Sequence, residues 1–223
     1  GCGLGWCAPY VLGRTPRAGR SVSVAAPGAK LTTRGQLAGV AVGTSSGTIQ
    51  EYVLDGLLGQ AGIAIDQIKK EEVKKVPVRF ELLMSGKLQA AALPEPFLSL
   101  AVKQGATLIA DDTEGANLSQ TVLVFSEKYL GAAAGAAAVE KLLGVWDEAV
   151  AIVNKDPGSF RGLLVEKARL PKPLETDYSV NTYPKHQLPT EEQVSAVLDW
   201  MQGAGLLAKS VTYADLVWSP SGK

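Results

Sequence analysis

Histidine and cysteine, which often carry catalytic or metal chemistry, are scarce in this chain. Its 223 residues include one histidine, His186, and two cysteines, Cys2 and Cys7. A zinc site of the usual kind needs three or four ligands drawn mainly from these residue types. A serine–histidine–aspartate triad would have to use His186, which lies in the proline-rich stretch TYPKHQLPT, far from any nucleophile motif. Since the phosphate-binding pattern GxxxxGK[ST] is also missing, the sequence predicts no metal, no cofactor and no catalytic residue.

An excess of charge of one sign is also missing. Lys+Arg and Asp+Glu number 22 each, so the formal net charge is zero, whereas a nucleic-acid partner selects for excess positive charge. The longest apolar stretch, residues 131–139, is mostly alanine and glycine and is shorter than the roughly 20 residues of a membrane-spanning helix. Hydrophobic residues make up 46% and charged residues 20% of the chain, as in ordinary globular proteins. We expect a soluble protein that does not bind nucleic acid.

The N-terminal residues differ from the rest of the sequence. Residues 1–36 are rich in arginine, glycine and proline and have no sustained period of 2 or 3.6, so we expect an irregular segment that adds little to the core. Three interpretations of the cysteines stay open: a lipoprotein with the lipid on Cys2, a disulfide between Cys2 and Cys7, or two free thiols. The charged and apolar regions of a signal peptide are absent from these residues, which weakens the first.

From Gly39 onward, strand-like and helix-like segments alternate. The run GVAVGT predicts a buried strand, and Ile49, Val53 and Leu57 at four-residue spacing predict the helix that follows it. We expect further strands over 75–78, 88–93 and 107–110, and helices over 79–85 and 96–104. This alternation predicts an α/β fold with a mostly parallel sheet and helices on both faces. After Ser126 the chain is mostly helical, with a capping box expected at 190–193.

The sharpest local feature is a run of small polar residues between the first strand and its helix: Thr44, Ser45, Ser46, Gly47 and Thr48. Free backbone N–H groups and the helix dipole favour negative charge at such a point. We therefore predict contact with an anionic or polar ligand group there. The simpler interpretation is a helix cap, including a capping box between Thr48 and Glu51, but a cap accounts for only one of the hydroxyl groups.

A second strand-to-helix junction carries the sequence ALPEPF. Its two prolines hold Glu95 and Phe97 in defined directions, so a carboxylate beside an aromatic ring could meet an amine or ring N–H of a ligand. The simpler interpretation is a rigid turn with Glu95 in the first helical turn, where the dipole favours it. From the residues alone this simpler interpretation is the better one.

Three runs of the sequence resemble the nitrate/sulfonate/taurine group of substrate-binding proteins of ABC importers, which includes relatives of the thiamine-pyrimidine-precursor binders. They are QLAGVAVGTSSGTIQEYVLDGLL, VPVRFELLMSGKLQAAALPEPFLSLAVKQG and LPTEEQVSAVLDWMQGAGLL, and the similarity is collinear from Gln36 to Leu216. The resemblance implies the type II periplasmic binding-protein fold, in which two α/β lobes clamp a ligand between them. It also places both candidate segments, residues 44–48 and 94–97, on one cleft.

The resemblance divides the chain and implies its function. Residues 1–36 would be an irregular remnant of lobe one, 37–115 a complete lobe two, and 116–223 a return strand with the helical part of lobe one, which is incomplete. A periplasmic or extracytoplasmic solute-binding protein is implied, with a small ligand and the importer permease as partners. Two alternatives share the fold: a biosynthetic enzyme of the pyrimidine-precursor or menaquinone-pathway type, and an effector-sensing domain.

Overall fold

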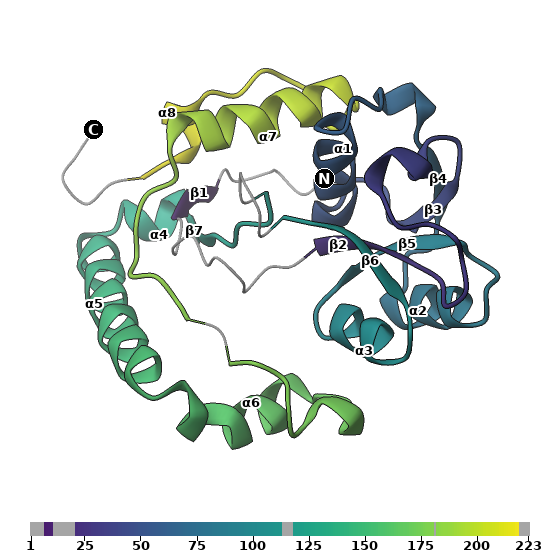
Figure 1. The fold of residues 1–223 in the computed structure, drawn as a ribbon. Coiled ribbons are helices and arrows are strands. Elements are labelled where there is room, and N and C mark those ends of the chain that lie inside the picture. Colours follow the sequence, from purple (N-terminus) through teal and green to yellow (C-terminus); the bar gives the residue numbers. More distant parts are fainter. Residues whose placement is uncertain (1–6, 11–20, 113–117, 181, 219–223) are drawn as a thin grey trace. The chain divides into compact units, whose positions relative to one another are not determined.

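The protein is represented by a computed structural model that describes residues 7–10, 21–112, 118–180 and 182–218. Its contacts divide the chain into two compact units (Figure 1). The sheet unit comprises Arg17–Ser119 and Phe160–Val180, and the helical unit comprises Gly1–Pro16, Gln120–Ser159 and Asn181–Lys223. Residues 21–36 and 160–180 make their contacts with the sheet, and the predicted division into two lobes stays a prediction.

A five-stranded sheet forms the centre of the sheet unit, in the order β4-β3-β5-β2-β6. β3 runs parallel to β4 and β5, whereas β2 runs antiparallel to β5 and β6. Four strands therefore point one way and β2 points the other, so the predicted mostly parallel sheet is confirmed. The strands are β2 (Ser21–Ala25), β3 (Ala41–Thr44), β4 (Lys69–Glu72), β5 (Ala90–Pro94) and β6 (Thr107–Asp111).

Helices cover both faces of this sheet, as predicted (Figure 1). On one face, Leu54 and Leu58 of α1 (Ile49–Gly59) are buried against Val42 and Ala90. On the other face, α2 (Val76–Met84) and α3 (Phe97–Lys103) bury their apolar side chains against β2 and β5. Each fully buried leucine contributes roughly 1.5–3 kcal/mol of hydrophobic stabilisation, so the two layers of helices hold the sheet from both sides.

Two expectations about strands are wrong. β2 lies inside the segment expected to be irregular, and it sits between β5 and β6 with Val24 and Ala25 at 0% exposure. Residues 75–78, expected as a strand, instead begin α2, with proline in its first turn. The strand that precedes α2 is β4, whose sequence KKEE is mostly exposed because β4 is an edge strand. Charged side chains are common on edges, where they prevent pairing with other chains.

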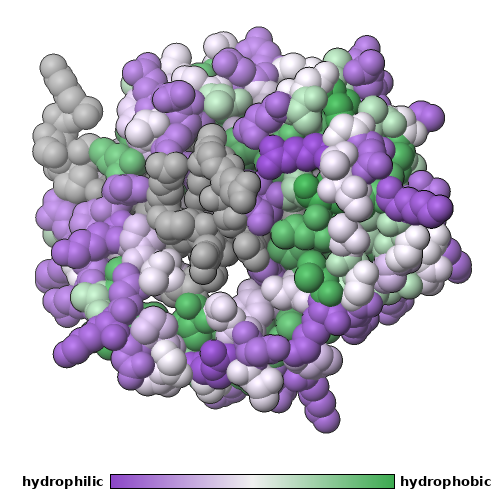
Figure 2. All heavy atoms as spheres, in the orientation of Figure 1, coloured by the Kyte–Doolittle hydropathy of each residue, from purple (hydrophilic) through white to green (hydrophobic). Residues whose placement is uncertain are grey.

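The other edge strand, β6, leaves apolar surface open. Leu108 of β6 keeps 41% of its surface exposed, and Figure 2 shows apolar residues gathered over the part of this face where Figure 1 places β2 and β6. The segment 160–180 contains α6 (Arg161–Ala168) and a short helical turn, Lys172–Leu174. It is tied to α3 by Lys103, whose Nζ lies 2.6 Å from Asp177 Oδ2.

The helical unit is built on a two-stranded sheet and four helices. β1 (Cys7–Tyr10) pairs antiparallel with β7 (Leu123–Ser126). Ser126 Oγ accepts the N–H of Tyr129. The capping box of Thr190 and Gln193 forms, so the cap prediction at 190–193 is confirmed. The helices are α4 (Glu127–Leu130), α5 (Ala133–Lys155), α7 (Glu191–Gly203) and α8 (Tyr213–Leu216).

Two features bear on the membrane and on the cysteines. Within the described ranges, no helix is both long enough and apolar enough to cross a membrane. Cys2 and the side chain of Cys7 lie outside the described residues, so the three interpretations of the cysteines stay as they were.

Candidate functional site

The two candidate segments lie at the same edge of the sheet. β3 and β5 are parallel neighbours in the register Val42↔Ala90 and Gly43↔Ala91, so their carboxyl ends, Thr44 and Pro94, lie at one edge. Open α/β sheets place their ligand crevices outside the carboxyl ends of the strands. The prediction that residues 44–48 and 94–97 share an edge is confirmed.

Backbone geometry shapes the turn between β3 and α1. Gly47 has φ of 70°, a left-handed conformation that costs other residues about 1–2 kcal/mol. The Thr48 hydroxyl donates to the Ser45 carbonyl at 2.6 Å. The capping box that Thr48 and Glu51 were able to form is absent, because Glu51 Oε2 instead accepts the N–H of Gly47 at 2.7 Å.

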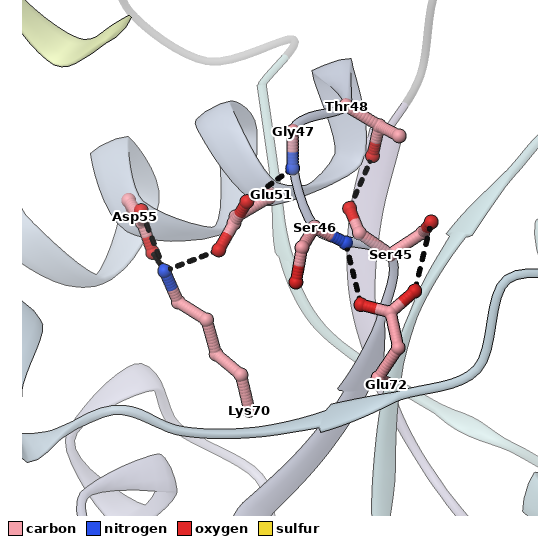
Figure 3. A network of polar contacts seen from close by, with 8 residues as sticks. All are labelled: Ser45, Ser46, Gly47, Thr48, Glu51, Asp55, Lys70 and Glu72. Atoms are coloured by element: carbon pink, nitrogen blue, oxygen red, sulfur yellow. Dashed lines mark hydrogen bonds and ion pairs between the residues drawn. The ribbon is translucent and has the colours of Figure 1, made fainter. Parts of the chain in front are cut away.

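A carboxylate from the neighbouring strand fills the other side of the turn (Figure 3). Glu72 of β4 accepts the Ser46 N–H at 2.8 Å through Oε2 and the Ser45 hydroxyl at 3.3 Å through Oε1. Hydrogen bonds from Ser46 lower the pKa of Glu72, so the carboxylate form is favoured. The sequence analysis did not select Glu72, and its only signal was a charged residue at the end of an edge strand.

A lysine fixes the first two turns of α1 to β4. Lys70 Nζ lies 2.9 Å from Glu51 Oε1 and 2.7 Å from Asp55 Oδ1, and Figure 3 shows it between the two carboxylates. Burial disfavours the charge of Lys70, but hydrogen bonds to Asp55 and Glu51 outweigh it and raise its pKa. Glu51 is thereby held from two sides, by Lys70 and by the N–H of Gly47.

A buried arginine fixes the ends of two strands behind the turn. Arg79 of α2 is 0% exposed. Its Nε and Nη2 donate to the Val73 carbonyl at 3.1 and 2.7 Å, and its Nη1 donates to the Ala92 carbonyl at 2.7 Å. Burial lowers its pKa. The residues that follow β4 and the end of β5 are therefore joined through one side chain, which the sequence analysis did not identify.

The second candidate segment makes internal contacts in this structure. The Glu95 carboxylate accepts the N–H of Ser99 at 3.2 Å and its hydroxyl at 2.9 Å. Phe97 packs against Phe80 of α2, with ring centroids 5.6 Å apart. These contacts are those of a rigid strand-to-helix turn, so a ligand contact by Glu95 or Phe97 stays a prediction.

Two buried hydroxyl groups lie on the face of the sheet that α1 covers. Thr44 Oγ1 and Ser23 Oγ are buried and have no hydrogen-bond partner among the described residues. Ser23 is opposite Ala92 in the register of β2 and β5, and the parallel register of β3 and β5 brings Thr44 to the other side of Ala92. A polar atom buried without a partner costs about 1–3 kcal/mol.

Two pockets are lined by described residues. One of about 780 Å³ is in the helical unit, where Glu127 and Lys209 line it, and another of about 440 Å³ is in the sheet unit at the edge opposite the turn, beside Gly28. Neither of these two pockets contains a predicted site residue. No cluster of three or more potential metal-ligating side chains occurs in the part of the chain that the structure describes.

His186 lies in the helical unit. Its N–H donates to Asp147 Oδ1 at 2.8 Å, and its Nδ1 lies 3.0 Å from the same oxygen. The side chain is 35% exposed. His186 is therefore a half-buried residue paired with Asp147.

The fold is that of the periplasmic binding proteins, with a mixed α/β lobe and a candidate site at the carboxyl ends of its strands. Among solved structures, the chain is similar to the periplasmic aliphatic sulphonate binding protein SsuA from Escherichia coli, with a TM-score of 0.79 and 21% identity over 97% of this chain and 70% of that chain. It is also similar to the alkanesulfonate-binding protein SsuA from Xanthomonas axonopodis pv. citri bound to MOPS, with a TM-score of 0.75 and 21% identity over 96% and 73% of the two chains.

The same fold also occurs in an enzyme. The desulfurization enzyme DSZB, solved in complex with biphenyl-2-sulfinic acid, has a TM-score of 0.67 and 13% identity over 94% of this chain and 76% of that chain. No family model matches the chain, and no curated protein matches it in sequence. These likenesses confirm the predicted fold class.

Proposed function

We propose that the chain is the solute-binding component of an ABC-type importer, a member of the nitrate/sulfonate/taurine group that works outside the cytoplasm. It captures a small anionic or polar organic ligand and delivers it to the permease. The sequence resemblance and the fold shared with two sulfonate-binding proteins support the same class. Among its ligand classes, the sulfonates are the best supported.

The observation that carries this proposal is the turn at residues 44–48. Its hydroxyl groups and N–H groups gather at the amino end of α1, where the dipole favours negative charge. The turn already holds two carboxylates, one on the Ser46 N–H and one on the Gly47 N–H. A turn that hydrogen-bonds carboxylate oxygens has the donors to hydrogen-bond a sulfonate, which presents oxygens of the same kind.

Enclosure of the ligand would come from two lobes. Ligand sites usually bury most of the ligand's surface, and the donors described above come from the sheet unit alone. Closure of a second lobe over the first would supply the missing walls, as in hinge closure around a ligand. Glu95 and Phe97, at the same edge as the turn, are the residues we propose as its further contacts.

A same-fold enzyme is the second candidate, because the fold of DSZB resembles that of this chain. Chemistry at the sheet edge would need a nucleophile or a base there. The Thr48 hydroxyl donates to a backbone carbonyl, whereas the Ser45 hydroxyl donates to the Glu72 carboxylate, a nucleophile beside a base. Ligand capture is preferred because the two sulfonate-binding proteins resemble the chain more closely, with TM-scores of 0.79 and 0.75 against 0.67 for the enzyme.

A thermal-shift screen tests the proposed function. Ethanesulfonate, taurine, nitrate and a hydroxymethylpyrimidine are each titrated against the full chain. Binding to the folded state stabilises by about 2.7 kcal/mol at a hundredfold excess over Kd, so a true ligand raises Tm clearly. Stabilisation by ethanesulfonate that saturates, with the ligand recovered unchanged, supports the proposal. No shift with any of the four compounds, or turnover of the ligand, contradicts it.

A further inference from the structure

The donors of the turn are already occupied by two carboxylates, which come from different elements. Glu51 belongs to α1 itself and accepts the Gly47 N–H. Glu72 belongs to β4 and accepts both the Ser46 N–H and the Ser45 hydroxyl. In Figure 3 the two carboxylates approach the turn from different sides. Any anion that uses the same donors must replace one of them.

The two carboxylates differ in how firmly they are held. The Glu51 side chain is 13% exposed, and Lys70 binds its second oxygen at 2.9 Å. Glu72 is exposed at the end of an edge strand and has no ion pair among the described residues. Movement of Glu51 would break a partly buried ion pair, whereas Glu72 can turn into solvent. Glu72 is therefore the carboxylate that a ligand can displace.

A buried hydroxyl group lies beside Glu72 in the register of the sheet. Thr44 Oγ1 is buried without a hydrogen-bond partner among the described residues, and the residue is 0% exposed. Thr44 is the register partner of Glu72 across β3 and β4, so both side chains emerge on the same face of the sheet, the one that α1 covers. An unpaired hydroxyl thus lies on the face from which Glu72 reaches the turn.

We propose that Glu72 is a specificity-determining residue that competes with the anionic group of the ligand for Ser45 and Ser46. The proposal rests on the proposed function. Its carboxylate presents two oxygens to the donors that a sulfonate would use, and its charge repels a second anion at the same place. The affinity of the site for anions is therefore set by the cost of moving Glu72 away, and only ligands whose other contacts offset that cost bind tightly.

The test compares Glu72→Gln with Glu71→Gln in the full chain. Both remove one negative charge from β4, but Glu71 is exposed and is opposite Gly43, so its side chain emerges on the other face. The probe is methanesulfonate, with inorganic sulfate as a second anion, and the readout is the amide resonance of Ser46. Glutamine keeps the shape of glutamate but is neutral, and circular dichroism checks that each variant is folded.

Glu72→Gln should bind methanesulfonate about tenfold more tightly than the parent, because a charge-assisted contact no longer competes and the repulsion is gone. Glu71→Gln should stay within about twofold of the parent, as a surface charge change does. Equal Kd values for the parent and Glu72→Gln, weaker binding by Glu72→Gln, or no shift of the Ser46 resonance in either protein would overturn the proposal.

Failure of this proposal differs from failure of the proposed function. If ethanesulfonate stabilises the parent chain but Glu72→Gln leaves every Kd unchanged, the function stands and the competition by Glu72 is wrong. If no sulfonate, nitrate or pyrimidine stabilises the parent, but Glu72→Gln binds sulfate at Ser46 more tightly than the parent does, the competition stands and the transport function is wrong.

Discussion

Lys70 is the cation that holds α1 to the edge of the sheet, and its removal should destabilise the sheet unit. Its partners, Asp55 and Glu51, have side chains that are 4% and 13% exposed. In Lys70→Met both carboxylates would lose this counter-ion. Removing one partner of a buried ion pair costs about 3–5 kcal/mol, and the 21% exposure of Lys70 places the expected loss near the lower end of that range.

The loss is measured by urea unfolding followed by circular dichroism. Fluorescence would be unsuitable, because all four tryptophans belong to the helical unit. Lys69→Met is the matched control, since Lys69 is the exposed neighbour in β4 and its side chain emerges on the other face. The double variant Lys70→Met/Asp55→Asn should recover part of the loss, because the more buried carboxylate is then neutral. A loss below about 1 kcal/mol, or an equal loss in Lys69→Met, would refute the reasoning.

The stability that the Lys70 ion pairs contribute depends on pH. The folded-state pKa of Lys70 is raised above its ordinary value of 10.5. Its contribution to stability is therefore fully present below that value and is lost as pH rises through the folded-state pKa. The difference in free energy of unfolding between the parent and Lys70→Met should therefore shrink only in strongly alkaline solution.

Two further predictions concern packing and the helical unit. Gly43→Ala should lower the free energy of unfolding by about 1–3 kcal/mol, because the added Cβ would lie 2.6 Å from Leu88 Cδ1 and 3.3 Å from Arg79 Cγ. The control is Gly59→Ala, where an added Cβ has nothing within 4 Å. In the same urea experiment the control should be neutral or slightly stabilising. In Asp147→Asn the chain should be less stable than the parent at neutral pH, because hydrogen bonds to His186 outweigh partial burial and lower the pKa of Asp147 below its ordinary value of 3.8. That difference should shrink as pH falls through the folded-state pKa, and a difference that persists unchanged in acid would contradict it.

The sequence predicted the parts of the fold whose signal is local. The helical period of Ile49, Val53 and Leu57 is repeated over three turns, and caps such as Thr190 act within four residues. The turn at 44–48 was identified for the same reason, because hydroxyl residues and glycine between a strand and a helix have few other uses.

The missed elements depend on partners that lie far away in the sequence. β2 has only five residues, among arginine, glycine and proline, and it is a strand because β5 and β6 pair with both of its sides. The four residues of β4 are all charged, which by itself indicates a loop. Only its position at the edge of the sheet explains why such a sequence forms a strand. Glu72 and Arg79 were missed likewise, since the sheet brings Ser46 near Glu72 and Ala92 near Arg79 across 26 and 13 residues of sequence.

Binding of an anionic ligand group at the turn between β3 and α1 is tested directly by titrating the isotope-labelled full chain with ethanesulfonate and following the backbone amide resonances. We expect saturable shifts centred on Ser45, Ser46 and Gly47, because these residues contribute the donors of the turn. Shifts confined to other residues, such as those around Lys209 in the helical-unit pocket, with the turn unaffected at saturation, would contradict it.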